Sequence, residues 1–289
     1  MFIKRDQRKI EEILQDPLDK RTCLRLSKRS SEFQGTVRIL CKESKLEALA
    51  NLKSLNLYDN SLTSVQGMGI LSQTPVEDIN LGSNNLASIP LELGALKGLK
   101  TLWLDDNKIT DFPVCICQLD GLEMLRLSGN ELQTVPPSIS NLQNLLVLAL
   151  DNNALNEFPL GILQLANLQH LWLRQNHLEE LPADVDKLVS LETLSVSSNH
   201  LTALPECLSS MQNLQYLYAN GNNIDRVSAD LCTLPRLLEV NLSNNAIQII
   251  PEEWILTWGE RDSATGKLVK KGSEGKNALI TLLGNPLQP

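Results

Sequence analysis

Residues 99–109 read LKTLWLDDNKI, with leucine or isoleucine at positions 1, 4, 6 and 11 and asparagine at position 9. The same frame begins nine times, first after a step of 24 residues and then after seven steps of 23 residues. The asparagine position is filled in all nine frames, so the chain is an internally repeated sequence. The frames begin at Leu52, Val76, Leu99, Leu122, Leu145, Leu168, Leu191, Leu214 and Leu237.

The second half of each unit repeats as well. After Ile109 come Phe112 and Pro113, and then Ile116 and Leu119, in the pattern LxxLPxxIxxLxx. With both halves in view, residues 52–259 resemble the 23-residue leucine-rich repeats of intracellular Ras-group proteins such as scribble, erbin and their plant relatives. The resemblance covers about seven tenths of the chain.

Physical chemistry explains this pattern as a coil of the backbone. The LxL pair lies in a short strand with alternate side chains pointing inward, and strands of successive units pair in parallel about 4.8 Å apart. Proline fixes φ at the start of the return segment, whose Ile and Leu pack under the sheet. The fold class is therefore an α/β leucine-rich-repeat solenoid. We expect a curved horseshoe, with a parallel sheet on its concave face and short helical or 3₁₀ turns on its convex face.

The ninth position predicts a ladder of stacked asparagines. A side-chain amide both donates and accepts hydrogen bonds, so it satisfies backbone groups where the chain turns off the strand. The predicted ladder consists of Asn60, Asn84, Asn107, Asn130, Asn153, Asn176, Asn199, Asn222, Asn245 and Asn285.

The two ends of a solenoid need covers. We interpret residues 1–51 as an N-terminal helical cap and degenerate repeat, with an amphipathic helix over residues 4–15, a stop at Pro17 and a degenerate strand at residues 24–26. Residues 52–259 form nine leucine-rich repeats. Residues 260–289 contain an excursion, hairpin-like around Leu268 and Val269, and a C-terminal capping repeat. We expect Trp254 and Trp258 to cover the last core layer. Alternatively, the N-terminal cap or the C-terminal excursion is itself a second segment that binds a partner.

Composition narrows the class of protein. With 42% hydrophobic residues the chain builds a substantial core, and its start lacks the apolar stretch of a signal peptide. No apolar run reaches the roughly 18 residues of a membrane span. The six cysteines are scattered, which favours reduced thiols over clustered disulfide caps. We therefore expect a cytoplasmic monomer, with the nucleus as an alternative compartment.

Side chains at positions 3, 5, 7 and 8 of each repeat project from the exposed, concave face of the sheet, termed the exposed sheet face below. All three tyrosines and two of the four tryptophans fall there. Amphipathic aromatic residues dominate binding hot spots, so these positions predict a protein-binding patch; alternatively, the rings cover the sheet and bind nothing. The predicted patch consists of Tyr58, Trp103, Asp105, Asp106, Met124, Arg126, Asp151, His170, Trp172, Arg174, Tyr216 and Tyr218.

Charge is unevenly distributed along the chain. Residues 1–51 carry a net charge of +4, residues 52–251 carry −12 and residues 252–289 carry 0, which gives −8 overall. An acidic array argues against nucleic acid, whose binding proteins need a basic stripe. It favours a partner with a basic patch, although a merely solvated acidic surface is the simpler interpretation.

Few residue patterns suggest chemistry. His177 and His200 share the tenth position of consecutive repeats and are expected to be adjacent, but Ala154 and Asn223 beside them complete no metal site. No catalytic triad spacing, HExxH motif or phosphate loop appears, so we expect no catalysis, no cofactor and no metal.

The sequence therefore favours a non-catalytic intracellular scaffold or adaptor in signal transduction, which binds a partner protein on its concave face. The resemblance to Ras-group repeats implies a small GTPase or a signalling phosphatase as the class of partner. A structural assembly component of cytoskeletal or ciliary machinery is the alternative.

Overall fold

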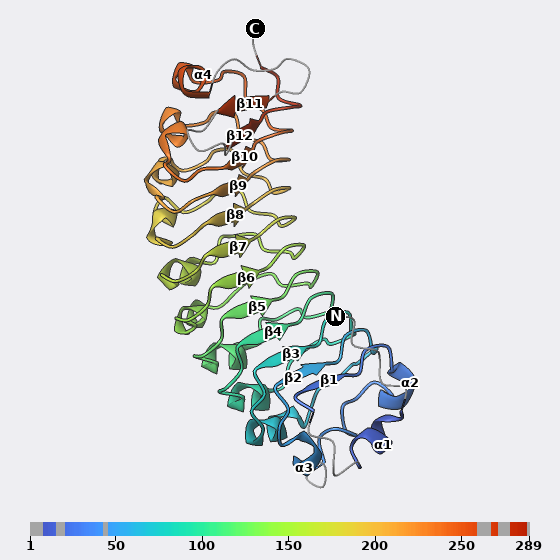
Figure 1. Ribbon diagram of the computed structural model, residues 1–289. Coiled ribbons are helices and arrows are strands. Elements are labelled where there is room, and N and C mark those ends of the chain that lie inside the picture. Colours follow the sequence, from blue (N-terminus) through green and yellow to red (C-terminus); the bar gives the residue numbers. More distant parts are fainter. Residues whose placement is uncertain (1–7, 16–20, 43–45, 259–266, 271–277, 288–289) are drawn as a thin grey trace. The chain divides into compact units, whose positions relative to one another are not determined.

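The computed structural model describes residues 8–15, 21–42, 46–258, 267–270 and 278–287. It divides the chain into two compact units, Met1–Leu145 and Leu146–Pro289. In each unit, strands of three or four residues follow one another through the repeats and short helices lie on the return segments (Figure 1). The predicted class, a leucine-rich-repeat solenoid with a parallel sheet and short 3₁₀ turns, is confirmed.

In the first unit, neighbouring strands pair in parallel and in chain order, with the leucine or isoleucine of position 4 at the centre of each strand. The strands are β1 (Cys23–Arg25), β2 (Ser54–Asn56), β3 (Asp78–Asn80), β4 (Thr101–Trp103) and β5 (Met124–Arg126). The helices are α1 (Ile10–Ile13), α2 (Ser30–Phe33), α3 (Leu46–Leu49), η2 (Met68–Gln73), η3 (Leu91–Ala95), η4 (Val114–Gln118) and η5 (Pro137–Asn141).

The second unit continues the same pattern and ends in a reversal. β12 pairs in parallel with β10, and β11 then pairs antiparallel with β12. The strands are β6 (Val147–Ala149), β7 (His170–Trp172), β8 (Thr193–Ser195), β9 (Tyr216–Tyr218), β10 (Glu239–Asn241), β11 (Lys267–Lys270) and β12 (Ala278–Thr281). The helices are η6 (Leu160–Gln164), η7 (Val185–Lys187), η8 (Glu206–Ser210), η9 (Ala229–Thr233) and α4 (Glu252–Trp258).

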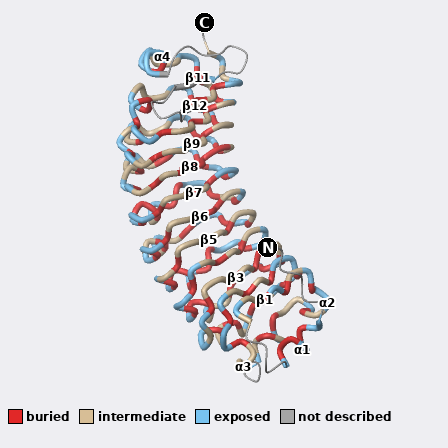
Figure 2. The backbone as a smooth tube through the Cα atoms, viewed as in Figure 1, coloured by how far each residue is buried: buried red, intermediate tan, exposed pale blue. Residues whose placement is uncertain are grey.

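The core of each unit lies between its strands and its 3₁₀ helices. The aliphatic residues at positions 1, 4, 6 and 11 are almost completely buried, as the red stretches of the backbone in Figure 2 show. Two phenylalanines, Phe112 and Phe158, join this core at position 14, where most repeats carry an aliphatic residue. Burying these side chains, rather than intrinsic strand propensity, holds three-residue strands in place.

The turn after each strand is left-handed at position 8. Every repeat, including the degenerate first one, has a positive φ there, between 50° and 78°. Glycine fits this conformation without strain, and Asn and Asp tolerate it better than most residues. The residues are Lys28, Asp59, Ser83, Asp106, Gly129, Asn152, Gln175, Ser198, Gly221, Asn244 and Gly284.

The asparagine ladder lies directly behind this turn. Asn176 Nδ2 donates to the Leu173 carbonyl of its own repeat at 3.1 Å and to the Leu150 carbonyl of the preceding repeat at 3.0 Å. Its Oδ1 accepts from the backbone amide of Leu155 at 3.0 Å. The same arrangement recurs at Asn84 in the first unit, and both asparagines are buried. The ladder therefore joins consecutive repeats through backbone groups that have left the sheet.

At the N-terminal end, the described part of the predicted helix over residues 4–15 contains only the single turn α1. Ile10, Ile13 and Leu14 are buried, as the amphipathic pattern predicts, whereas residues 1–7 and Pro17 lie outside the described residues. A buried arginine connects this turn to the first repeat. Arg29 Nη1 donates to the Arg8 carbonyl at 2.7 Å and to Glu32 Oε1 at 3.1 Å.

At the C-terminal end, Trp254 of α4 is fully buried, and its indole Nε1 lies 3.1 Å from the carbonyl oxygens of Ser228 and Ala229. Trp254 stands at position 18 of its repeat, which Leu231 fills in the preceding repeat, so it belongs to the core of the ninth repeat, whereas the side chain of Trp258 lies outside the described residues. Leu268 of β11 lies opposite Ile280 of β12. The predicted hairpin-like excursion therefore forms an antiparallel edge on the capping repeat.

Candidate functional site

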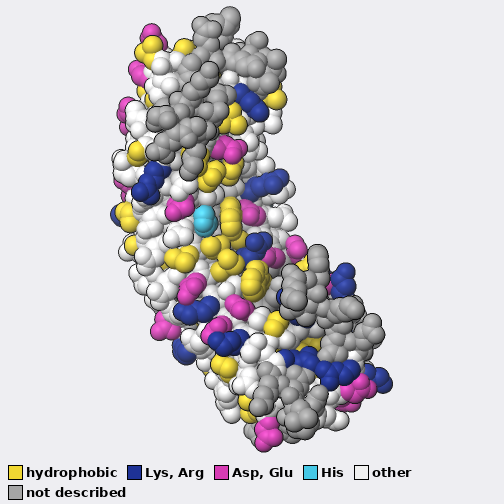
Figure 3. Space-filling view, viewed as in Figure 1, with side chains coloured by type: hydrophobic (Ala, Val, Ile, Leu, Met, Phe, Trp, Pro, Cys, Tyr) yellow, Lys and Arg dark blue, Asp and Glu magenta, His cyan; other side chains and the backbone are white. Residues whose placement is uncertain are grey.

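The exposed sheet face of the second unit carries two pairs of rings. His170 and Trp172 on β7 are stacked with centroids 5.9 Å apart, and Tyr216 and Tyr218 on β9 are stacked with centroids 6.4 Å apart. All four side chains are half-buried. Hydrophobic side chains gather around a histidine on the face shown in Figure 3. Two strands of one sheet thus present four flat side chains in two parallel rows.

Strand β8 lies between the two ring pairs and carries small hydroxyl residues. Ser195 pairs in register with Trp172 on one side and with Tyr218 on the other. Thr193 and Ser195 are 7% exposed and Ser197 is 3% exposed, because the larger side chains on both sides cover them. Thr193 Oγ1 lies 3.0 Å from His170 Nδ1, so it helps to fix the orientation of that ring.

A carboxylate borders the tyrosine pair. Glu239 on β10 lies next to Tyr216 in the sheet register, and its Oε2 accepts a hydrogen bond of 3.2 Å from the Tyr218 hydroxyl. Burial, together with the negative charge of Glu239, raises the pKa of Tyr218 to about 12. The phenol therefore stays protonated at physiological pH and remains a hydrogen-bond donor to the carboxylate.

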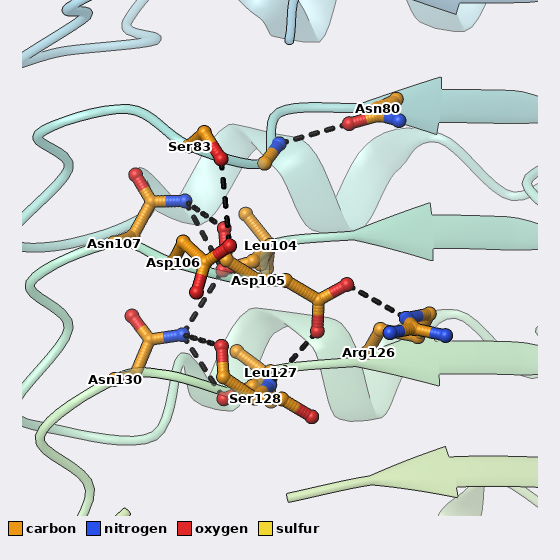
Figure 4. Close-up of polar contacts among 11 residues, drawn as sticks. Asn80, Ser83, Leu104, Asp105, Asp106, Asn107, Arg126, Leu127, Ser128 and Asn130 are labelled. Atoms are coloured by element: carbon orange, nitrogen blue, oxygen red, sulfur yellow. Dashed lines mark hydrogen bonds and ion pairs between the residues drawn. The ribbon is translucent and has the colours of Figure 1, made fainter. Parts of the chain in front are cut away.

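The first unit combines one ring with a closed ion pair. Trp103 on β4 is half-buried and lies beside Arg126 of β5 in the sheet register. Arg126 Nε donates to Asp105 Oδ2 at 2.6 Å, and Asp105 Oδ1 accepts from the Ser128 amide at 3.0 Å (Figure 4). Asp105 therefore has both oxygens engaged within the chain, and the charge of Arg126 is already balanced.

The remaining predicted site residues are more dispersed. Tyr58 is 41% exposed, and among the described residues no ring contact joins it to another aromatic side chain. Met124 is half-buried beside Thr101, and Asp106 is exposed next to Ser83. Asp151 Oδ1 accepts from the backbone amide of Arg174, whose side chain is exposed.

Sequence reasoning missed three features of this face. It did not single out Glu239, the hydroxyl strand β8 or the left-handed turn at position 8. Glu239, Thr193 and Ser195 stand at positions 3 and 5, so the repeat frame alone places them beside the rings. Glycine, asparagine and aspartate at many of the eighth positions were the available signal for the turn.

A second group of side chains lies at the tenth positions, away from the exposed sheet face. The rings of His177 and His200 stack with centroids 5.7 Å apart, which confirms their predicted adjacency. His200 also borders an open hollow of about 730 Å³ whose lining includes Glu179 and Glu180. Across the described ranges, no group of three or more His, Cys, Asp or Glu side chains is arranged to hold a metal ion.

Four of the six cysteines are poorly suited to act as nucleophiles. All six are free, and three of them are buried. Burial, reinforced by the charge of Glu92, raises the pKa of Cys41 to about 12, and burial also raises the pKa values of Cys115, Cys117 and Cys207. Thiols with raised pKa values hold little thiolate at neutral pH and react poorly.

Within the described ranges, no helix has both the length and the apolar character needed to cross a lipid bilayer. The repeated coils, the ladder of asparagines and the half-buried rings on an open sheet are together typical of a repeat protein that binds other proteins.

Comparison with known families agrees with this class of protein. The family described as "leucine-rich repeat region" matches residues 76–176, and the family described as "leucine rich repeat" matches residues 166–224. The chain is a leucine-rich-repeat protein, and leucine-rich repeats form protein-binding domains that are typically non-catalytic.

Among curated relatives, human leucine-rich repeats and immunoglobulin-like domains protein 1 is 36% identical over 86 residues, which cover 28% of this chain and 8% of that protein. The matched segment spans 10% or less of the length of the curated relatives.

Solved structures share the fold over more of the chain. A leucine-rich-repeat protein from Leptospira interrogans is 27% identical, with a TM-score of 0.70 over 85% of this chain and 70% of that chain. The leucine-rich-repeat ectodomain of the plant membrane receptor kinase GASSHO1/SCHENGEN3 from Arabidopsis thaliana was solved in complex with Casparian strip integrity factor 2. It is 31% identical, with a TM-score of 0.65 over 72% of this chain and 26% of that chain.

Proposed function

We propose that this protein is a non-catalytic scaffold or adaptor in signal transduction that binds a partner protein through its exposed sheet face. The observation that carries the proposal is the pair of ring stacks on β7 and β9, which present half-buried, preoriented aromatic side chains. Rigid aromatic side chains contribute large contact areas at low conformational cost, and they dominate the energetics of protein interfaces.

The partner and compartment follow from the character of the repeats. The Ras-group repeat pattern supports a small GTPase or a signalling phosphatase as the partner class. The net charge of −12 over residues 52–251 supports a partner with a basic patch and argues against a nucleic acid as the partner. Six free cysteines support a reducing compartment, so we place the protein in the cytoplasm, as a monomer.

The proposal is tested by removing the rings and comparing co-purifying proteins. The variant combines Trp103→Ala, Trp172→Ala and Tyr218→Ala in the full chain, with thermal unfolding measured to confirm the fold. The matched control combines Leu91→Ala, Val114→Ala and Leu160→Ala, which removes side chains that are 78%, 56% and 65% exposed on the 3₁₀ helices.

We expect the ring variant to lose the main partner and the control to retain it. An unchanged set of partners with the ring variant would refute binding by the exposed sheet face. Loss of the partner in the control alone would move the interface to the helical side.

A second candidate function is that of a structural assembly component of cytoskeletal or ciliary machinery. It is favoured by apolar side chains left in solvent at the C-terminal end, where Ile249 is 68% exposed, Ile255 is 41% exposed and Leu256 is 79% exposed. Such a component would keep its partners when the exposed sheet face is altered and lose them with Ile255→Ser and Leu256→Ser.

A further inference from the structure

The two units differ in the partner of the carboxylate that lies beside their aromatic rings. In the first unit, Asp105 beside Trp103 forms an ion pair with Arg126 at 2.6 Å. In the second unit, Glu239 beside the tyrosine pair accepts one hydrogen bond from the neutral Tyr218 hydroxyl. Among the described residues, no lysine or arginine forms an ion pair with Glu239. Within the described residues, the negative charge of Glu239 is therefore available to an external cation.

The position of this carboxylate makes it suited to a cation that also contacts rings. Glu239 is half-buried, in register with Tyr216 and bonded to Tyr218, so its environment is drier than that of a fully exposed acid. A cation within about 6 Å of a ring centroid is attracted by the negative face of the ring. A charge placed over the tyrosine pair would therefore gain from the rings and from the carboxylate together.

We propose that Tyr216, Tyr218 and Glu239 form a binding site for the guanidinium group of an arginine side chain from the partner protein. This inference rests on the proposed function, because the arginine belongs to the protein that docks on the exposed sheet face. Arginine fits better than lysine, since its flat guanidinium stacks on a ring while its edge donates to a carboxylate. Lysine offers a compact, strongly hydrated ammonium that stacks less well.

Two described cations flank the site on the exposed sheet face of the second unit. Arg174 stands at position 7 of the repeat that contains β7, and Lys267 lies on β11, opposite Thr281 and two strands beyond β10. The proposed site uses positions 3 and 5 of β9 and position 3 of β10, so it lies two strands and a different row away from Arg174. An anionic ligand would meet the Glu239 carboxylate directly and is disfavoured.

The site is tested with blocked single amino acids as probes. N-acetyl-arginine amide is titrated into the full chain carrying ¹³C-labelled tyrosine, and the ring resonances of Tyr216 and Tyr218 are followed by NMR. N-acetyl-citrulline amide provides a neutral group of similar shape, and N-acetyl-lysine amide provides a cation without a flat face. We expect saturable shifts with the arginine probe, weaker binding of the lysine probe and no saturable shift with the citrulline probe.

Two variants test how much the charge of Glu239 contributes to the affinity of the arginine probe. Glu239→Gln keeps the shape and removes the charge, and it is expected to weaken the arginine probe about threefold to fivefold, the scale of a partly exposed charge pair. Glu206→Gln is the matched control, because it removes a carboxylate from an exposed position on η8, and it should leave the affinity unchanged. Equal affinities for arginine and citrulline, equal affinities for arginine and lysine, or an unaltered affinity in Glu239→Gln would each overturn the proposal.

Failure of this proposal is distinguishable from failure of the proposed function. If the arginine probe does not bind while the ring variant still loses its partner, the exposed sheet face binds proteins without an arginine site. If the probe binds as expected while the ring variant keeps its partners, the arginine site stands and the proposed docking face is wrong.

Discussion

A single side-chain amide connects three backbone segments at each turn of the coil. Asn176 is 3% exposed, and its bonds reach carbonyls of two repeats and the amide of Leu155. A buried backbone group without a partner costs about 1–3 kcal/mol, so no apolar residue replaces asparagine at low cost. This requirement explains why position 9 is asparagine in all nine repeats of residues 52–259 and in the capping repeat, while its neighbours vary.

Asn176→Ala is therefore expected to lower the free energy of unfolding by about 1–3 kcal/mol. The buried carbonyls of Leu150 and Leu173 and the amide of Leu155 lose their side-chain partner. Urea denaturation of the full chain measures the change. Asn223→Ala is the control, because Asn223 is exposed and lies outside the ladder, and it should change the free energy by less than about 0.5 kcal/mol. Equal effects of the two substitutions would contradict the ladder.

Tyr218 is expected to ionise at about pH 12, above the ordinary tyrosine pKa, because burial and the Glu239 carboxylate disfavour the phenolate. Glu239→Gln should lower that pKa, whereas Glu206→Gln should not. Absorbance at about 295 nm during an alkaline titration follows tyrosine ionisation, with Tyr218→Phe to assign the step. A pKa unaffected by Glu239→Gln would show that the carboxylate does not act on the ring.

The same shift has a defined effect on stability. The folded-state pKa of Tyr218 is raised, so the folded and unfolded states hold the same proton below about pH 10. Between about pH 10 and pH 12 the unfolded state releases that proton first, and the stability associated with Tyr218 falls as pH rises.

The location of most individual residues is predictable from the repeat frame, because a fixed spacing assigns each residue to the core, the turn or the exposed sheet face. The frame predicted the ring positions, including Trp172 and Tyr218. The frame did not single out Glu239 as a site residue. The role of Glu239 depends on a hydrogen bond from the Tyr218 hydroxyl on the neighbouring strand, and residue spacing does not predict such a side-chain contact. The ion pair that neutralises Asp105 was hidden for the same reason.

At the scale of elements, the ends of the array depart from the repeat. The amphipathic pattern predicted a helix over residues 4–15, whereas the described part forms one turn, Ile10–Ile13. A helix this short is not stable by itself, and it persists because Ile10 and Ile13 are buried and the Ile10 amide donates to Glu32. Periodicity predicts which face is buried and does not fix how many turns form.

Helix α4 replaces the 3₁₀ turn of the ninth repeat, and Trp254 attaches it to η9. Trp254→Phe keeps a ring in the core but removes the indole N–H, so the Ser228 and Ala229 carbonyls lose a donor. We expect a loss of about 1–2 kcal/mol in the free energy of unfolding, measured by thermal or urea denaturation. Leu256→Ala is the control, since Leu256 is 79% exposed on the same helix. A larger loss from Leu256→Ala would mean that α4 is attached through its other face.

At the scale of the whole molecule, stability is distributed over many similar interfaces between neighbouring repeats. Within each unit, ladder bonds and strand pairs connect one repeat to the next. Stability in such an array is approximately a sum of nearest-neighbour terms. A local substitution is therefore expected to act mainly on its own part of the chain.

Native-state hydrogen exchange tests this locality. Asn107→Ala should reduce the protection of amides in the first unit more than in the second, and Asn176→Ala should do the reverse, because each asparagine bonds within its own unit. Mass spectrometry of peptides from the exchanged protein measures both units in one experiment. A uniform loss of protection from either substitution would indicate a single cooperative block.

The left-handed turn also limits how the sequence can drift over evolutionary time. Position 8 must accept a positive φ and position 9 must remain asparagine, but neither requirement applies to positions 3 and 5. Substitutions at positions 3 and 5 can therefore change the exposed sheet face without disrupting the solenoid. Strand β8 with its hydroxyl residues and strand β9 with its tyrosines already show this variation. A combinatorial library randomised at those two positions, with the eighth and ninth held fixed, would inherit this tolerance and supply new recognition surfaces on an unchanged frame.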